Sequence, residues 1–242
     1  MRLLVTRPQP DSGAQAEKLA ALGHEVIDAP LLEVEFLEFS PLPLDVAQAL
    51  IATSRNGLRA LASSPELQAA LKLPLYAVGK ATGDLARDLG FIEIHSGPGT
   101  AEELVPLIAS ECKPGAGALL HLAGERQAFD LKTALEDKKF KVEQPVVYRV
   151  LLADSFAEGA REALGKGTLD GVILMSPATA QTYVALVDAS DLRHRAMGLT
   201  YFCLSHAVAE PLTAYDDARV LIAGRPSEDD LLALIGHETA HC

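Results

Sequence analysis

Three strand–helix units occur twice in this chain, in the same order and at similar separations. In each set the first strand is an apolar run that ends in a hydroxyl residue, and apolar positions at helical spacing follow the strands. The first set has its strands at 49–54, 75–79 and 92–94, and the second set has them at 171–176, 201–205 and 220–222. A repeated series of this kind predicts an internal duplication, so the fold should consist of two similar substructures.

The segments outside these two sets also repeat. A strand at 118–122, a helix that ends near Lys138 and a strand near Pro145 follow the same plan as residues 2–34. The chain therefore consists of four segments, each forming half of a lobe, in the order short, long, short and long. Since the two middle halves are contiguous, they can close into one lobe, and the outer halves must form the other.

This order predicts an α/β fold with two similar lobes, each a parallel sheet flanked by helices, joined by a two-stranded hinge. Alternating strands and helices with β-branched runs favour parallel sheets that are covered on both faces. The expected ranges are 1–34 with 152–242 for lobe 1, 38–147 for lobe 2, and 31–38 with 145–152 for the hinge strands.

The charge balance limits the partners of the chain. It carries 33 Asp and Glu against 21 Lys and Arg, a net charge of −12, which argues against nucleic acid and anionic membranes. No apolar run reaches the length of a membrane span, and the first residues enter a strand instead of a signal peptide. Three cysteines without ligand spacing are typical of a reducing cytosol, so we expect a cytoplasmic protein.

Basic and hydroxyl residues follow the strand ends, which is where ligands bind in open α/β sheets. Cations there and free N–H groups at helix N-termini favour an anion. The candidate substrate-binding residues are Arg7, Ser54, Arg55, Lys80, Thr82, Arg126, Ser176 and Ser205. Taken singly, each cation is also explained as a solvated loop charge, and Thr82 and Ser176 as helix caps. Together they predict a cleft that binds a polyanion, for which an acidic chain needs a local basic patch.

Tyr148 lies in the apolar strand at 145–151, one of the two predicted hinge strands. If these strands are the only crossings between the lobes, Tyr148 lies at the floor of the cleft, where small-molecule sites tend to form. The alternative is a packing residue with a satisfied hydroxyl group.

The stretch HETAH at 237–241 fits the zinc-protease pattern. That pattern needs a long helix and a third ligand, whereas Gly236 is predicted to end the helix, so we expect no zinc catalysis. The sequence also lacks a dinucleotide-binding glycine motif, a Walker loop and a nucleophile elbow. Their absence argues against nucleotide chemistry and against a triad hydrolase.

Five short motifs, spread over almost the whole chain, resemble those of uroporphyrinogen-III synthases. They are LVTRP at 4–8, TSRNG at 53–57, VGKAT at 78–82, VYR at 147–149 and SPAT at 176–179. The resemblance implies two α/β lobes joined by a two-stranded ladder, the linear tetrapyrrole hydroxymethylbilane as substrate, and no metal or organic cofactor. It places the family's hinge tyrosine at Tyr148 and a threonine contact at Thr82. The turn SHAV at 205–208 departs from the pattern, because Val208 offers no hydroxyl and leaves Ser205 as the substitute.

The implied reaction removes the hydroxyl group of the substrate as water and gives an azafulvene. The last pyrrole then attacks through its substituted carbon, by way of a spiro intermediate, so that this ring is inverted in the product uroporphyrinogen III. Unaided closure gives the uninverted isomer. The resemblance therefore implies a lyase of heme biosynthesis whose catalysis is mostly enforced geometry. Tyr148 is the candidate proton donor.

The alternative function and the expected partners also follow from the sequence. The alternative function is a non-catalytic two-lobe protein that binds a small polyanion and turns nothing over. We expect a monomer that makes transient contact with the enzyme that produces hydroxymethylbilane.

Overall fold

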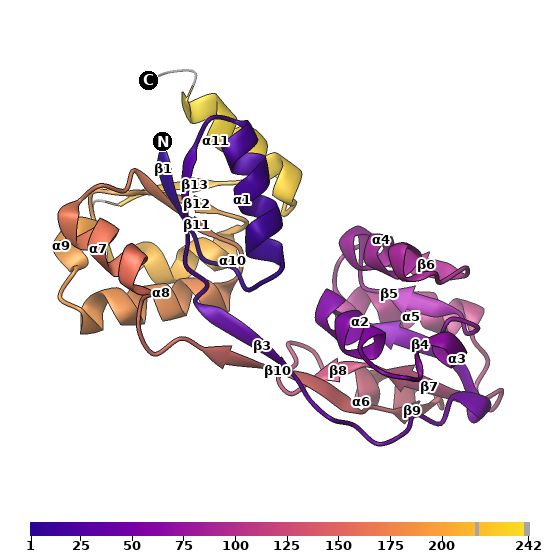
Figure 1. Cartoon of the computed structure of the whole chain (residues 1–242). Helices are drawn as coiled ribbons and strands as arrows, with labels where there is room; N and C mark the ends of the chain where they lie inside the picture. The colour runs from indigo at the N-terminus through magenta and orange to yellow at the C-terminus, as the bar shows by residue number, and fades with distance from the viewer. Residues whose placement is uncertain (216–217, 240–242) are drawn as a thin grey trace. The chain divides into compact units, whose positions relative to one another are not determined.

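The computed structural model describes residues 1–215 and 218–239, which form two compact units. Unit 1 consists of Met1–Glu33 and Leu151–Cys242, and unit 2 is the continuous segment Val34–Val150. Each unit has a parallel sheet with helices on both faces (Figure 1). The inner strands of both sheets are largely apolar on successive residues because helices cover both faces.

The sheet of unit 1 has the strand order β13-β12-β11-β1-β2. Its strands are β1 (Arg2–Val5), β2 (Glu25–Asp28), β11 (Gly171–Leu174), β12 (Thr200–Cys203) and β13 (Arg219–Ile222). One face packs on α1 (Asp11–Ala21) and α11 (Glu228–Thr239), through a cluster that includes Leu3, Leu19 and Ile235. The other face is covered by α7 (Glu158–Lys166), α8 (Pro177–Ala189), α9 (Arg193–Ala196), α10 (His206–Ala209) and a 3₁₀ turn at Glu210–Ala214.

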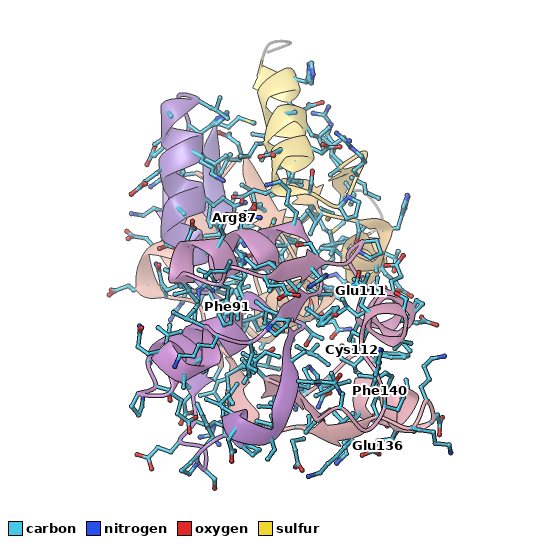
Figure 2. All side chains as sticks on the ribbon, turned by 90° about the vertical axis from the view of Figure 1, so that its right-hand side faces the viewer. Arg87, Phe91, Glu111, Cys112, Glu136 and Phe140 are labelled. Carbon is cyan, nitrogen blue, oxygen red and sulfur yellow. The ribbon has the colours of Figure 1, made fainter. Side chains whose placement is uncertain are left out.

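The sheet of unit 2 has the order β6-β5-β4-β7-β9. Its strands are β4 (Ala47–Ala52), β5 (Leu75–Ala77), β6 (Ile94–Ser96), β7 (Ala118–His121) and β9 (Lys141–Glu143), preceded by a 3₁₀ turn at Leu44–Val46. The helices α2 (Arg55–Ala62), α3 (Leu67–Ala70) and α4 (Lys80–Leu89) cover one face, and α5 (Ala101–Glu111) and α6 (Leu131–Glu136) cover the other. Figure 2 looks onto this unit. It labels the buried Phe91, which belongs to the hydrophobic cluster on one face of the sheet, and the buried Phe140, which belongs to the cluster on the other face.

The two sheets correspond strand by strand. The strands β4, β5 and β6 occupy the positions that β11, β12 and β13 occupy in unit 1, and β7 and β9 occupy those of β1 and β2. This is the pairing that the repeated strand–helix series predicts. The predicted fold class, two similar α/β units with parallel sheets flanked by helices, is confirmed.

A separate three-stranded sheet has the order β3-β10-β8, with β3 (Leu32–Phe36), β10 (Val146–Leu152) and β8 (Ala123–Gly124). The backbone N–H of Leu37 donates to the carbonyl of Val147 at 3.0 Å, and that of Ala153 donates to the carbonyl of Leu31 at 3.0 Å. These partners make β3 and β10 antiparallel. The chain passes from one unit to the other within β3 and again within β10.

Two local predictions are wrong. The third strand of unit 2 is Ile94–Ser96, not 92–94, because the pairing of Ile94 with Leu75 of β5 sets its position and leaves Ile92 exposed. Helix α11 also continues through Gly236 to Thr239. Leu231 and Ile235 are fully buried in this helix, and their packing outweighs the roughly 1 kcal/mol that a glycine costs in a helix interior. Ala240 and His241 of the HETAH motif lie outside the described residues, as does Cys242.

His24 makes the stability of unit 1 sensitive to acid. It is buried, its Nε2 atom has no hydrogen-bond partner among the described residues, and burial, with the nearby Met1 amino group, lowers its pKa from 6.5. The unfolded chain therefore binds more protons than the folded chain as the pH falls below about 6.5. Stability should be complete above that value and should decline until the pH passes the folded pKa.

We expect His24→Leu to reduce the loss of melting temperature between about pH 7 and about pH 5, where unperturbed histidines gain their charge. Each proton in this window changes the free energy of unfolding by up to about 1.4 kcal/mol per pH unit. The exposed His194 offers a matched control, and His194→Leu should retain the full acid response. An equal response in both variants would contradict the assignment.

No helix in the described ranges is both long enough and apolar enough to cross a membrane.

Candidate functional site

A cavity of about 480 Å³ lies at the carboxyl edge of the sheet in unit 2. Thr53 and Val78 line it where β4 and β5 end, and His121 lines it as the last residue of β7. Thr100 begins α5 at its rim, and Tyr148 reaches it from β10. The carboxyl edge of a parallel sheet is where the sequence predicts a ligand.

Tyr148 is held by its neighbours in β8 and leaves its hydroxyl group available. Its carbonyl accepts a hydrogen bond from the N–H of Glu125 at 3.0 Å, and Gly124 is its partner in register. A Cβ atom at Gly124 would lie only 2.6 Å from Cζ of the Tyr148 ring, so the ring occupies space that only a glycine leaves open. The hydroxyl group has no hydrogen-bond partner in the part of the chain that the structure describes, and it can therefore donate to a ligand.

Among the described residues that line the cavity, Arg126 is the only lysine or arginine. It is exposed and forms no ion pair with a described residue. At the rim, Thr100 and Glu103 form a capping box: the Thr100 hydroxyl donates to Glu103 Oε2 at 2.6 Å and accepts from the Glu103 N–H at 3.3 Å. The first turn of α5 adds backbone N–H groups. These groups and Arg126 favour an anion on this side of the cavity, whereas the carboxylate of Glu102, which also lines it, opposes one.

His121 connects the cavity to the sheet. Its side chain is 1% exposed, with Nε2 3.0 Å from Thr53 Oγ1 and Nδ1 3.1 Å from Gln144 Oε1. Burial lowers the pKa of His121 below 6.5, and the hydrogen bond to Gln144 opposes that effect in part. The ring is therefore neutral at neutral pH.

The other predicted residues of unit 2 do not line this cavity. Ser54 caps α2 by accepting the Asn56 N–H at 3.2 Å, and Arg55 is the first residue of that helix. Lys80 is 88% exposed and forms an ion pair with Asp84. Thr82 is buried in α4 at 5% exposure. Their substrate contacts stay predictions.

The predicted residues of unit 1 lie at its own carboxyl edge. Arg7 is buried, with Nη2 3.3 Å from Asp11 Oδ2 and Nη1 3.5 Å from Glu228 Oε1. Ser176 caps α8 by accepting the Thr179 N–H at 3.1 Å. Ser205 precedes α10 and makes no capping hydrogen bond. Arg7 is therefore already matched by two carboxylates, which is the pattern of a structural ion pair.

Within the described ranges, no three His, Cys, Asp or Glu side chains gather as metal ligands.

Of the residues predicted from the sequence, Tyr148 and Arg126 line this cavity, and their roles stay predictions. Thr53 and His121 also line it and are not among the predicted site residues. The strand at 118–122 is predicted from its apolar pattern, and the histidine inside it then counts as a core residue. Its signal is a polar side chain at the last position of a buried parallel strand, which is the position that faces a ligand edge.

Comparison with known families assigns the chain. Residues 14–233 match the model of the family described as uroporphyrinogen-III synthase HemD. The chain belongs to this family.

A curated member, the porphyrin biosynthesis protein HemD of Ruminiclostridium josui, is 22% identical over 96% of this chain. The match covers 47% of that protein, so the chain spans about half the length of the curated relative.

Solved structures of family members share the fold. The uroporphyrinogen-III synthetase of Helicobacter pylori 26695 matches with a TM-score of 0.65 and 21% identity, over 97% of this chain and 98% of its own. A mutant uroporphyrinogen III synthase of the extremely thermophilic bacterium Thermus thermophilus matches with a TM-score of 0.62 and 18% identity, over 99% and 98%. At these identities the likeness to the solved structures concerns the fold alone.

Proposed function

We propose that this protein is a uroporphyrinogen-III synthase. It cyclises hydroxymethylbilane to uroporphyrinogen III, with inversion of the last pyrrole ring and loss of water, in heme biosynthesis. Family membership over 14–233 supports the reaction. The observation that carries the assignment to a site is the hydroxyl group of Tyr148, which has no hydrogen-bond partner among the described residues and lines the same cavity as Arg126.

Tyr148 acts as the proton donor of this reaction. Its O–H transfers a proton to the substrate hydroxyl as the C–O bond breaks, so water leaves and the protonated azafulvene, an azafulvenium cation, forms beside the phenolate. After the ring closes, the α-carbon of the last pyrrole loses a proton and its electron pair restores the aromatic ring. That proton returns to the phenolate of Tyr148, which balances the cycle without a cofactor. A positioned general acid typically contributes about 10²–10⁴-fold.

Arg126 and the first turn of α5 bind a carboxylate of the substrate. The substrate is a polycarboxylate, and the guanidinium group of Arg126 can hold one carboxylate with two parallel hydrogen bonds. This contact is made by substrate and transition state alike, so it acts on binding more than on chemistry.

The decisive experiment mixes the purified protein with hydroxymethylbilane and separates the isomers of the product after oxidation. A uroporphyrinogen-III synthase gives the inverted isomer faster than the unaided reaction gives the uninverted one. The alternative function, a non-catalytic protein that binds a small polyanion, would bind the substrate and leave the unaided isomer as the product. The uninverted isomer alone would overturn the proposal.

Three further properties stay predictions. They are a monomeric state, transient contact with the enzyme that makes hydroxymethylbilane, and a cytoplasmic location.

Arg126→Ala should raise KM for hydroxymethylbilane about three- to tenfold and change kcat little, because it removes uniform binding. The effect should shrink as salt rises, since the contact is between charges at an exposed position. Lys72→Ala is the matched control: it removes the same charge from an exposed residue of the same unit that does not line the cavity. An unchanged KM at low salt would remove Arg126 from the site.

Gly124→Ala should displace the Tyr148 ring, because the new methyl group would lie 2.6 Å from Cζ and 2.8 Å from the hydroxyl oxygen. We expect turnover to fall severalfold, with a loss of about 1–3 kcal/mol of stability from overpacking. In a Tyr148→Phe background the same substitution should reduce turnover little further. Gly159→Ala is the control, since no atom of the described residues lies within 4 Å of a Cβ atom there. Normal turnover in Gly124→Ala would show that the ring position is not required.

A further inference from the structure

Both ring nitrogens of His121 are hydrogen-bonded to residues that follow the neighbouring strands. Thr53 follows β4 and Gln144 follows β9, and these strands flank β7 in the sheet. The hydrogen-bonded series is Thr53 Oγ1, His121 Nε2 at 3.0 Å, then His121 Nδ1 and Gln144 Oε1 at 3.1 Å. Of the three, Thr53 and His121 line the cavity, and Gln144 lies behind them.

The chemistry of these groups sets the direction of both hydrogen bonds. The carbonyl oxygen of Gln144 can only accept, so Nδ1 of His121 carries a proton. The ring is almost fully buried, which favours the neutral form, and a neutral ring protonated at Nδ1 has a bare lone pair at Nε2. Thr53 must therefore donate its hydroxyl proton to Nε2. Its oxygen keeps only acceptor capacity toward the cavity.

The cavity therefore offers hydrogen-bond donors on one side and a hydrogen-bond acceptor at Thr53. Arg126 and the backbone N–H groups of the first turn of α5 supply donors, and Tyr148 supplies a hydroxyl proton. Glu102 also lines the cavity and adds a charged acceptor. The hydroxyl proton of Thr100 is already used by Glu103. Thr53 presents an acceptor without charge, which suits an N–H group and repels a carboxylate.

We propose that His121, oriented by Gln144, is a positioning residue that makes Thr53 a hydrogen-bond acceptor for a pyrrole N–H of the substrate. This inference rests on the proposed function for its substrate, since a linear tetrapyrrole carries both N–H donors and carboxylates. It assigns the N–H side of one ring to Thr53 and the carboxylate side to Arg126. A merely structural His121 would stabilise the sheet and leave substrate recognition unchanged.

The first test needs no substrate. Nitrogen-15 NMR of the full chain distinguishes the two neutral tautomers of histidine, and the His121 signals are identified by their loss in His121→Phe. We expect the proton on Nδ1 in the wild-type protein near pH 7.5. A proton on Nε2 would overturn the proposal, because Thr53 would then be free to donate into the cavity.

The second test reverses the direction of the bonds. Gln144→Glu keeps the shape of the side chain and places a carboxylate beside Nδ1, which favours the imidazolium form. Nε2 then donates to Thr53, whose own proton turns toward the cavity. KM should rise about three- to tenfold if Thr53 accepts from an N–H group. A fall in KM would show that Thr53 binds a carboxylate and would overturn the proposal.

The third test asks whether His121 acts through Thr53. Thr53→Val and His121→Phe should each lower kcat/KM about three- to tenfold, and the double variant should be no worse than the more affected single variant. Thr53→Ser should retain most of the activity, since it keeps the hydroxyl group. Independent effects that multiply in the double variant would overturn the proposal. If the wild-type protein gives no inverted product, the proposed function fails, whereas the tautomer measurement still decides the hydrogen-bond direction.

Discussion

Tyr148→Phe should lower the turnover of hydroxymethylbilane by about tenfold or more while leaving the protein folded. The substitution keeps the ring that fills the space beside Gly124 and removes only the oxygen. That oxygen makes no hydrogen bond to a described residue, so the free energy of unfolding should change by no more than about 1 kcal/mol. The loss of rate follows from the loss of the general acid.

The residual product should still be the inverted isomer, because ring inversion is imposed by the binding geometry and not by the proton. Tyr76→Phe is the matched control in the same unit. The Tyr76 hydroxyl is hydrogen-bonded to Cys112 Sγ at 3.4 Å and does not line the cavity, so this variant should keep its turnover. Full activity in Tyr148→Phe would rule out the acid role, and a large loss of stability would make the tyrosine structural.

Arg7→Ala should destabilise unit 1 by about 3–5 kcal/mol, the usual cost of removing one partner of a buried ion pair. The side chain of Arg7 is 9% exposed, and Asp11 and Glu228 are 14% and 25% exposed. Without the guanidinium group, two carboxylates lie close together with little water. Lys18 still compensates Glu228 at 3.2 Å, which limits the loss.

Denaturant unfolding measures this effect, and Arg219→Ala supplies the comparison. Arg219 is 59% exposed and pairs with Glu238, so its removal should cost less than about 1 kcal/mol. The sequence-based prediction gives Arg7 a substrate contact instead. A stable Arg7→Ala protein with a raised KM would favour that interpretation over the structural one.

The sequence predicts the architecture well because the repeat gives two independent copies of each strand. β-Branched and apolar runs identify the parallel strands, and the short–long–short–long order predicts which of them share a sheet. Local boundaries are less well determined. Three residues at 92–94 cannot specify which of them pair with β5, and the packing of Ile235 carries α11 past Gly236. Both outcomes depend on tertiary contacts that a local pattern does not contain.

The candidate site is predicted only in part for a similar reason. Tyr148 and Arg126 belong to a recognisable strand and a loop, so their residue types suggest a role. His121 lies in an apolar strand, and its importance comes from Thr53 and Gln144, which are 68 and 23 residues away in the chain. Lys80 looks like a ligand contact in the sequence but is paired with Asp84 one helical turn away.

The discontinuous make-up of unit 1 has a consequence for the order of folding during synthesis. Unit 2 is complete once Val150 has left the ribosome, and all five of its parallel strands are then present. The strands β1 and β2 emerge before unit 2, but β1 lies in the interior of its sheet and pairs on one side with β11, which is synthesised after unit 2. This segment is therefore synthesised before unit 2 but belongs to the unit that closes after it. Until β11 is synthesised, the unpaired apolar edge of β1 is exposed and can pair with strands of other chains.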